Sequence, residues 1–290
     1  MIDALDRQLR DLAMAALRRA GALGVLPTPL DAVAAAAGVA EVIDIGSLPE
    51  DLLRARPRAM SKILGAYVFG ADTAFVDRSL GLGRARFVQA HETAHRLLPW
   101  HAQAFLLDDT RRLFRETEEA LEREANLLAA HLIFQGGGFV TLAAGRETSL
   151  RAARALAREH GASCHATLRH YVEHHRDPVA LLAAGRITRR DGTVPIWTAT
   201  ESPAFRRRFG PLAGRIPEHG LCVVGGADLA KLVGTVRLSG RVHREEVGIA
   251  DRRGELQPFL AEAFRQRSVL VLISPLPAPR SRGAGLALAS

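Results

Sequence analysis

Two histidines and a glutamate within residues 87–98 are spaced so that they could work on one metal ion. His91, Glu92 and His95 form a single H-E-x-x-H motif. Residues four apart lie on one face of a helix, so both imidazoles can bind the same ion. Catalytic zinc takes three protein ligands and leaves a fourth position for water, whose proton Glu92 could accept. The motif therefore predicts a zinc site, open also to manganese, with Glu92 as the catalytic base.

A five-residue motif can also arise by chance, because the chain contains 11 histidines. Histidine pairs on exposed helices are common as well. The flanking residues argue against both alternatives, since Phe87, Val88, Leu97 and Leu98 make the segment apolar. In a buried helix, histidines without partners would be costly. We therefore interpret the motif as a metal site.

A third ligand is expected from the helical pattern over residues 116–134. At about 100° per residue, Glu122 shares a face with Ala129, whose small side chain lets another helix approach closely. Glu124 lies on the other side and is interpreted as a solvated charge. Glu122 is the predicted ligand, and Glu118 and Glu119 are the alternatives.

The composition is that of an ordinary soluble globular chain, with 48% hydrophobic and 24% charged residues. The net charge of +8 would suit an acidic partner, but Lys62 and Lys231 are the only lysines. Such an arginine bias is typical of a GC-rich genome and is weak evidence for DNA binding. Cys164 and Cys222 form no metal-type pair, and the N-terminus has no signal-peptide pattern. We therefore expect a cytoplasmic location.

Periodicity and turn residues predict an α+β protein. Helices are expected over 1–22, 30–37, 84–98, 116–134, 150–160, 163–174, 178–185 and 256–267, and residues 101–115 form a loop or short helix. Strands are expected over 39–45, 63–69, 74–77, 195–199, 221–224, 234–238 and 269–273. The strands at 63–69 and 74–77 flank turn residues and form a hairpin.

Changes in composition and pattern divide the chain into four parts. A mostly helical zincin-like metallopeptidase domain with a small sheet is expected over 1–145, followed by a helix-turn-helix-like region over 146–187. A C-terminal α+β domain is expected over 188–276, and a flexible tail over 277–290.

Four segments, in order, resemble the ImmA/IrrE family of zinc-dependent endopeptidases. They are the hairpin at Gly65-Ala66, Arg86-Phe87, the motif His91-Glu92-x-x-His95, and Glu122-x-x-Ala125-Asn126-x-x-Ala129-Ala130. The last segment matches the family pattern E-x-x-A-N-x-F-A-A, except that Leu128 replaces the aromatic residue. The proline that usually follows in the family is missing from Leu132-Ile133-Phe134-Gln135, so the end of this helix is expected to differ.

This resemblance implies that His91, His95 and Glu122 bind zinc and that Glu92 is the catalytic base. It also implies a substrate, because members of the family cleave helix-turn-helix transcriptional repressors in mobile-element control or in the stress and DNA-damage response. The IrrE branch has a similar layout, with a GAF-like domain at the C-terminus, and a strand beside the cleft could hold the substrate by strand addition. The alternatives are a non-proteolytic regulator that binds a repressor or DNA, and an antitoxin-like partner.

Four other histidines are also candidate site residues. His101 is a candidate for contact with substrate in the cleft, or for no role. His131 is expected on the opposite side of its helix from Glu122, in a structural role. His170 and His174 are four apart and are interpreted as part of a solvated basic face rather than as a second metal site.

Overall fold

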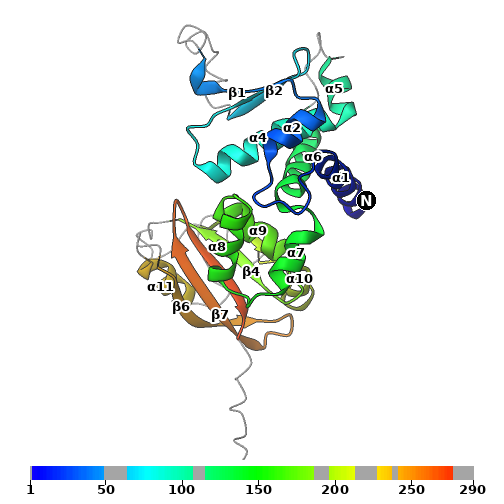
Figure 1. Ribbon diagram of the computed structural model, residues 1–290. Coiled ribbons are helices and arrows are strands. Elements are labelled where there is room, and N and C mark those ends of the chain that lie inside the picture. Colours follow the sequence, from blue (N-terminus) through cyan, green and yellow to red (C-terminus); the bar gives the residue numbers. More distant parts are fainter. Residues whose placement is uncertain are drawn as a thin grey trace, which may run out of the picture. The chain divides into compact units, whose positions relative to one another are not determined.

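The computed structural model describes residues 2–48, 64–106, 115–185, 196–212, 227–236 and 241–276. The chain divides into two compact units (Figure 1). Unit 1 comprises residues 1–147 and 151–167, and unit 2 comprises residues 148–150 and 168–290. Each unit combines helices with a sheet, so the predicted α+β class is confirmed. The predicted strand at 221–224 and the predicted tail at 277–290 lie outside the described residues.

Unit 1 contains a small sheet and a group of packed helices. Its elements are α1 (Ile2–Arg19), α2 (Leu30–Ala37), β1 (Glu41–Asp44), η1 (Ile45–Ser47), β2 (Gly65–Val68), β3 (Thr73–Val76), α4 (Leu82–Leu97), α5 (Pro99–Leu106), α6 (Arg115–Phe134) and α7 (Gly137–Ala144). The strand order is β1-β3-β2, with β1 parallel and β2 antiparallel to β3. The predicted hairpin is confirmed, and β2 is an edge strand of this sheet.

Asp72 connects the β2–β3 turn to α4. Its backbone has a positive φ of 47°, which short polar side chains tolerate in tight turns. Its carboxylate accepts a hydrogen bond from the Tyr67 hydroxyl at 2.8 Å and pairs with Arg96 at 3.0 Å. Since Arg96 lies in the last turn of α4, this network holds the sheet against the helix that carries the H-E-x-x-H motif.

The core of unit 1 is formed by one face each of α1, α4 and α6. Leu9 and Leu17 of α1 and Leu128 of α6 are fully buried in one apolar cluster. The predicted close approach of α6 to another helix is confirmed, because α6 packs on α4 and Ala125 and Ala129 are completely buried. Small side chains at such a contact let two helix axes come near the lower end of the usual ~8–10 Å.

The chain turns sharply between α6 and α7, at the position where the family pattern has its proline. Gln135 and Gly136 have positive φ values of 53° and 55°, and the two helices meet at 52°. The Gln135 side chain accepts the Gly24 N–H at 2.7 Å and donates to the Val25 carbonyl at 2.8 Å, among other bonds. The Gln135 side chain thus fixes the α1–α2 loop. Among the described helices none is by itself long and apolar enough to cross a membrane, and only this bent pair meets that test.

Helices α8 (Leu150–Glu159) and α9 (Cys164–Glu173) confirm the predicted helix pair. The division between the two units passes through this pair, because α8 from Arg151 belongs to unit 1 and α9 from Leu168 belongs to unit 2. His160 follows α8 and lies 5.8 Å and 5.2 Å, between ring centroids, from Phe134 and Phe139. This aromatic group anchors the end of α8 to the α6–α7 break.

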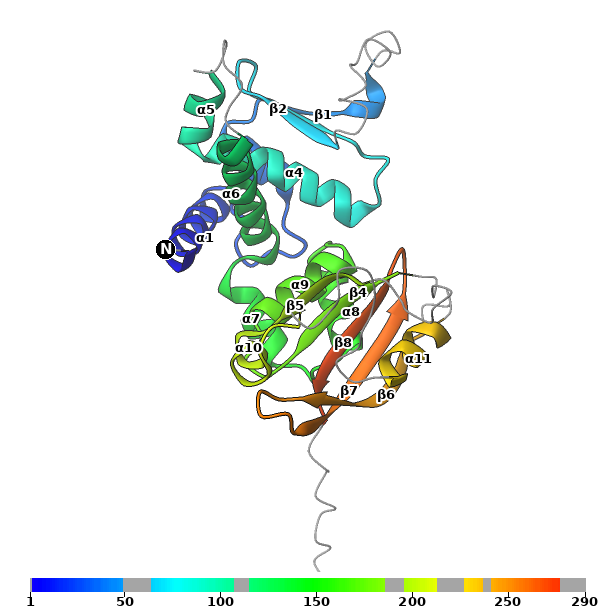
Figure 2. The same ribbon diagram turned by 180° about the vertical axis from the view of Figure 1, so that it is seen from behind.

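Unit 2 is built on one five-stranded antiparallel sheet with the strand order β5-β4-β8-β7-β6 (Figure 2). Its elements are β4 (Ala180–Ala184), β5 (Ile196–Glu201), α10 (Pro203–Phe209), α11 (Ala227–Thr235), β6 (His243–Ala250), β7 (Leu256–Arg265) and β8 (Val269–Pro275). Phe205 and Phe209 of α10 and Leu232 of α11 share one buried cluster with Phe259 and Val271 of the sheet. Both helices therefore cover the same face of the sheet.

Three predicted elements of unit 2 are wrong. The predicted helices at 178–185 and 256–267 are the strands β4 and β7, and Gly234 and Thr235, predicted in a strand, lie in α11. Leucine, alanine and glutamate favour helix, but β4 is buried on both faces and hydrogen-bonds to a strand on each side. In β7, the charged Glu262 is buried, so the sequence of this strand does not show the alternation of apolar and polar residues that predicts a strand. Its carboxylate is satisfied by the Leu150 N–H and by Arg244, so it is tolerated in the interior.

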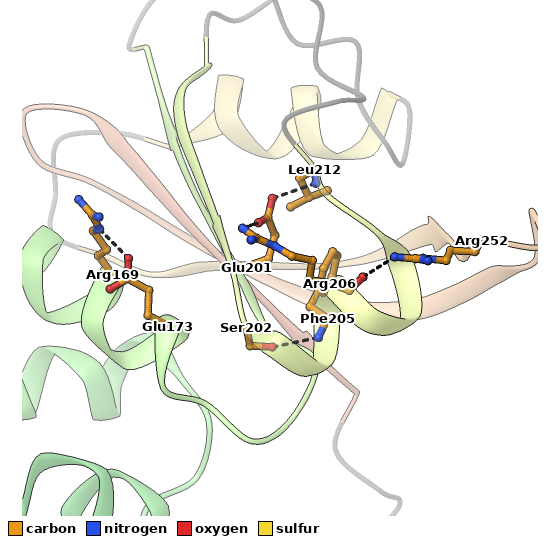
Figure 3. Close-up of polar contacts among 8 residues, drawn as sticks. All are labelled: Arg169, Glu173, Glu201, Ser202, Phe205, Arg206, Leu212 and Arg252. Carbon is orange, nitrogen blue, oxygen red and sulfur yellow. Dashed lines mark hydrogen bonds and ion pairs between the residues drawn. The ribbon is translucent and has the colours of Figure 1, made fainter. Parts of the chain in front are cut away.

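Helix α10 is a seven-residue element that the sequence reading missed, and polar contacts hold both of its ends (Figure 3). The Ser202 hydroxyl accepts the Phe205 N–H at 3.1 Å, which is an N-cap with proline in the first turn. Arg252 donates to the Arg206 carbonyl at 3.1 Å near the other end. The buried Glu201 accepts the Leu212 N–H at 2.8 Å and pairs with Arg206, so the chain that leaves the helix is also fixed.

We expect Gln135→Ala to lower the free energy of unfolding by about 2–4 kcal/mol, because several buried groups lose their partner at ~1 kcal/mol or more each. Gln135→Gly should be less destabilising than the alanine variant by about 1 kcal/mol, since glycine adopts a positive φ without strain. Thermal and denaturant unfolding of the three proteins measure both differences. An alanine variant as stable as the wild type would contradict the assigned role of this side chain.

Candidate metal centre

The H-E-x-x-H motif lies on α4 as predicted, in the buried second half of the helix. His91 and His95 are one turn apart, and their Nε2 atoms are separated by 3.1 Å. His95 is buried, and His91 is mostly buried with one edge open to solvent. Two imidazole nitrogens thus face one point in space, which is what binding a shared ion requires.

Helix α6 brings the predicted third ligand to the same point. The Glu122 carboxylate lies 3.2 Å from His91 Nε2 through Oε2 and 3.5 Å from His95 Nε2 through Oε1. Ligands on a tetrahedral ion with bonds of ~2.1 Å are about 3.4 Å apart, so these separations fit such an ion. The alternatives Glu118 and Glu119 are exposed and lie outside this group of ligand atoms.

The pKa values of Glu122 and His91 are shifted by their neighbours in this group. Hydrogen bonds to His91 and His95 lower the pKa of Glu122 well below its ordinary value. Burial acts to lower the pKa of His91, but its hydrogen bond to Glu122 and the charge of Glu92 together raise it. Glu122 therefore favours a positive charge beside it, and His91 is one group that can carry that charge.

Glu92 lies next to this group without being part of it. Burial raises the pKa of Glu92 to about 7. The charge of His91 acts to lower this pKa, and the negative charge of Glu122 acts to raise it. The backbone of Gly65 in β2 comes so close that a Cβ atom there would lie 2.5 Å from Glu92 Oε1 and 2.3 Å from Val88 Cγ1. Only glycine leaves this carboxylate its present place beside the edge strand.

A cleft of about 460 Å³ opens beside these residues. It is lined by Leu64, Gly65, Arg84, Phe87, Val88, His91, Glu92 and Asn126. The edge strand β2 forms one wall and α4 another, and Glu92 and one metal-facing histidine are exposed to the same space. The cleft therefore gives a ligand access to both the candidate base and the candidate metal position.

Two residues beside the cluster were misassigned from the sequence. His101, predicted to face the cleft or to have no role, is completely buried, and its Nδ1 lies 2.9 Å from His95 Nδ1. Glu124, predicted to be solvated, accepts the Trp100 indole N–H at 2.6 Å and lies 3.3 Å from His101 Nε2. Burial and the nearby His95 lower the pKa of His101 to about 4. The sequence signal was Pro99, which begins a new helix and so turns these residues back toward α4 and α6.

For the remaining histidines, the structure confirms the prediction for His131 and corrects the prediction for His170. His131 pairs with Asp6 at 3.0 Å in the interior, as its predicted structural role requires. His170 was predicted on a solvated face but is buried, whereas its neighbour His174 is exposed. Both lie near Glu173 in a second group of potential ligands, although that carboxylate already pairs with Arg169 at 2.8 Å (Figure 3).

Comparison with known proteins places these residues in a family. Residues 60–170 match the Peptidase_M78 family model, described as an IrrE N-terminal-like domain, and no curated protein matches the sequence. A solved structure of a Mycobacterium tuberculosis transcriptional regulator has a similar fold, with a TM-score of 0.55 at 14% identity over 93% of this chain and 80% of that chain. Over residues 60–170, this chain therefore carries an IrrE N-terminal-like domain of the Peptidase_M78 metallopeptidase family.

Proposed function

We propose that the protein is a zinc-dependent endopeptidase whose substrate is a helix-turn-helix transcriptional repressor. The observation that carries the proposal is the group of three ligand atoms on α4 and α6, with Glu92 beside it and an open cleft in front. Membership of the domain in a metallopeptidase family supports a bound metal. Two histidines and one glutamate are a ligand set that suits zinc and accepts manganese.

The proposed mechanism assigns each side chain one task. His91, His95 and Glu122 would hold the ion, which when bound supplies Lewis acidity for peptide hydrolysis. Glu92 would accept a proton from the attacking water and then deliver it to the leaving amine. Its burial supports this role, because a carboxylate with a pKa near 7 can both take up and release a proton near neutral pH.

The edge strand β2 would bind the substrate chain. On the side away from β3, β2 pairs with no other strand of the described residues, so its backbone there could pair with an extended peptide by strand addition. Gly65 brings this strand within contact of Glu92, so a peptide paired with β2 would pass close to the base. Leu64, Phe87 and Val88 line the cleft and would receive an apolar side chain.

The family resemblance supports a repressor as the substrate, with control of a stress, DNA-damage or mobile-element response as the result. A cytoplasmic site of action follows from that substrate. We also propose that α8 and α9 form the helix-turn-helix-like region and that unit 2 is the GAF-like domain. Because β4 at residues 180–184 is an inner strand of that sheet, this domain begins before residue 188 in our proposal.

A non-proteolytic regulator that binds a repressor or DNA is the second candidate function. The observation that favours it is that the structurally similar mycobacterial protein is itself described as a transcriptional regulator. Cleavage of a repressor separates the two candidates, because only the first requires the base and the metal.

The metal ligands can be tested one by one. We expect His91→Ala, His95→Ala and Glu122→Ala each to lower bound zinc well below one equivalent per chain, because three protein ligands are needed to hold the ion. Glu118→Ala and Glu119→Ala are matched controls from exposed positions of the same helix and should keep their zinc. Elemental analysis after gel filtration gives the metal content. Full zinc content in Glu122→Ala would move the third ligand elsewhere.

The base can be separated from the metal site with Glu92→Gln. This variant should keep zinc and its melting temperature but cleave the cognate repressor about 10²–10⁴-fold more slowly, since general-base catalysis typically contributes that factor, or ~3–5 kcal/mol. Rates are measured on purified repressor, with a chelator-treated sample as control. Wild-type cleavage by this variant would rule out the mechanism, and derepression in cells without cleavage would support the regulator instead.

The close approach of β2 to the base predicts a large effect from one methyl group. Gly65→Ala should lower the rate of cleavage at least tenfold, because the new Cβ would displace Glu92 or the edge strand. Gly70→Ala, in the turn of the same hairpin, meets no atom within 4 Å and is the matched control. Zinc content should be unchanged in both variants. Equal cleavage rates would show that β2 does not need its present distance from Glu92.

A further inference from the structure

His95 contacts a buried chain of groups on the side facing away from the metal cluster. Its Nδ1 lies 2.9 Å from His101 Nδ1, and His101 Nε2 lies 3.3 Å from Glu124 Oε2. These three residues come from α4, α5 and α6. The same carboxylate oxygen accepts the Trp100 N–H at 2.6 Å, so its position is fixed from a second direction.

Only one placement of the protons satisfies both contacts of a neutral His101 side chain. If Nδ1 of His95 carries the hydrogen, it donates to His101 Nδ1, and the hydrogen of His101 is then on Nε2, where it faces Glu124. The reverse placement would put the hydrogen of His95 on Nε2, toward His91 and Glu122, and would point a lone pair of His101 at a carboxylate. The contacts therefore favour the tautomer in which His95 Nε2 presents its lone pair to a metal ion.

The fold holds this arrangement rigidly. Pro99 begins α5 directly after α4 ends, and the His101 N–H donates to the Leu98 carbonyl at 2.9 Å, which fixes the corner between the helices. His101 is fully buried, so solvent cannot replace either of its partners. An imidazole buried in this way is stable only while both of its nitrogens are satisfied.

The two candidate histidine ligands differ in this respect. Nδ1 of His91 has no hydrogen-bond partner among the described residues, although it is buried. A protein contact at Nδ1 thus orients the His95 ring from the side away from the ion, whereas Nδ1 of His91 makes no such contact. This asymmetry makes His95 the preorganised ligand of the pair.

We propose that His101 and Glu124 are positioning residues that hold His95 in the tautomer and orientation that bind the metal ion. This inference rests on the proposed function, because it assigns these two residues a task at the proposed metal site. Partners of this kind typically change metal affinity by about 10–100-fold when they are removed.

The test compares variants that remove an acceptor with variants that keep it. His101→Phe removes the acceptor for His95, while in His101→Asn the side-chain oxygen can take the place of Nδ1. Glu124→Leu removes the carboxylate, while Glu124→Gln keeps an oxygen for His101 and Trp100. His131→Phe is the control for loss of a buried, carboxylate-paired histidine elsewhere in unit 1.

Zinc affinity is measured on the full-length chain by competition with a chromophoric chelator, beside the visible spectrum of the cobalt-substituted protein and the melting temperature without metal. We expect about 10–100-fold weaker zinc binding and an altered cobalt spectrum for His101→Phe and Glu124→Leu. The Asn and Gln variants should restore affinity to within a few-fold, and the His131→Phe control should bind zinc like the wild type.

Several outcomes would overturn the inference. A folded His101→Phe variant with wild-type zinc affinity and a wild-type cobalt spectrum would by itself overturn the inference. If His101→Phe does not fold, wild-type zinc affinity and cobalt spectrum in Glu124→Leu would overturn it instead. The Glu124 side chain is partly exposed, so its replacement is better tolerated. Equal losses in the Phe and Asn variants would also contradict it. A wild-type chain that binds no zinc would instead overturn the proposed function, and this inference with it.

Discussion

The contact between α4 and α6 is the constraint on which the candidate site depends. Ala90 and Ala94 on α4 and Ala125 and Ala129 on α6 are all fully buried, and Ala94 and Ala125 lie in one apolar cluster of these packed helices. Glu122 has a short side chain, and it reaches the histidines of α4 only because the helix axes approach this closely. Larger residues at these positions would separate the helices and leave each helix with an incomplete set of ligands.

The same contact brings a buried carboxylate, that of Glu92, and a half-exposed one, that of Glu122, close to two histidines. Glu92 is buried with a raised pKa, and hydrogen bonds to His91 and His95 lower the pKa of Glu122. In unit 2, by contrast, the buried Glu201 and Glu262 are each satisfied by a backbone N–H and an arginine. The buried carboxylates of unit 2 are therefore compensated within the fold, whereas Glu92 and Glu122 of unit 1 lie beside candidate metal ligands, and that difference marks unit 1 as the part of the described chain suited to chemistry.

The two units also differ in their similarity to known proteins. The family match covers residues 60–170, which hold the complete candidate site, and ends close to the start of the second unit at Leu168. The likeness to the mycobacterial regulator extends over 93% of the chain, so the arrangement of elements in unit 2 also has a counterpart in a solved structure. The elements of both units thus have counterparts in a solved structure, and the task of the second unit in this chain is part of our proposal.

The sequence by itself determined the features that follow from local geometry. A helical period of 3.6 residues brings His91 and His95 together and selects Glu122 over Glu124, and turn residues define the β2–β3 hairpin. Only the tertiary structure decided which segments of leucine, alanine and glutamate became strands, because β4 and β7 owe their form to partners on both sides rather than to propensity. It also decided the surroundings of His101, since the α4–α5 corner brings that residue between side chains of two other helices. Contacts between residues distant in sequence depend on how whole elements pack, and no local pattern encodes that packing.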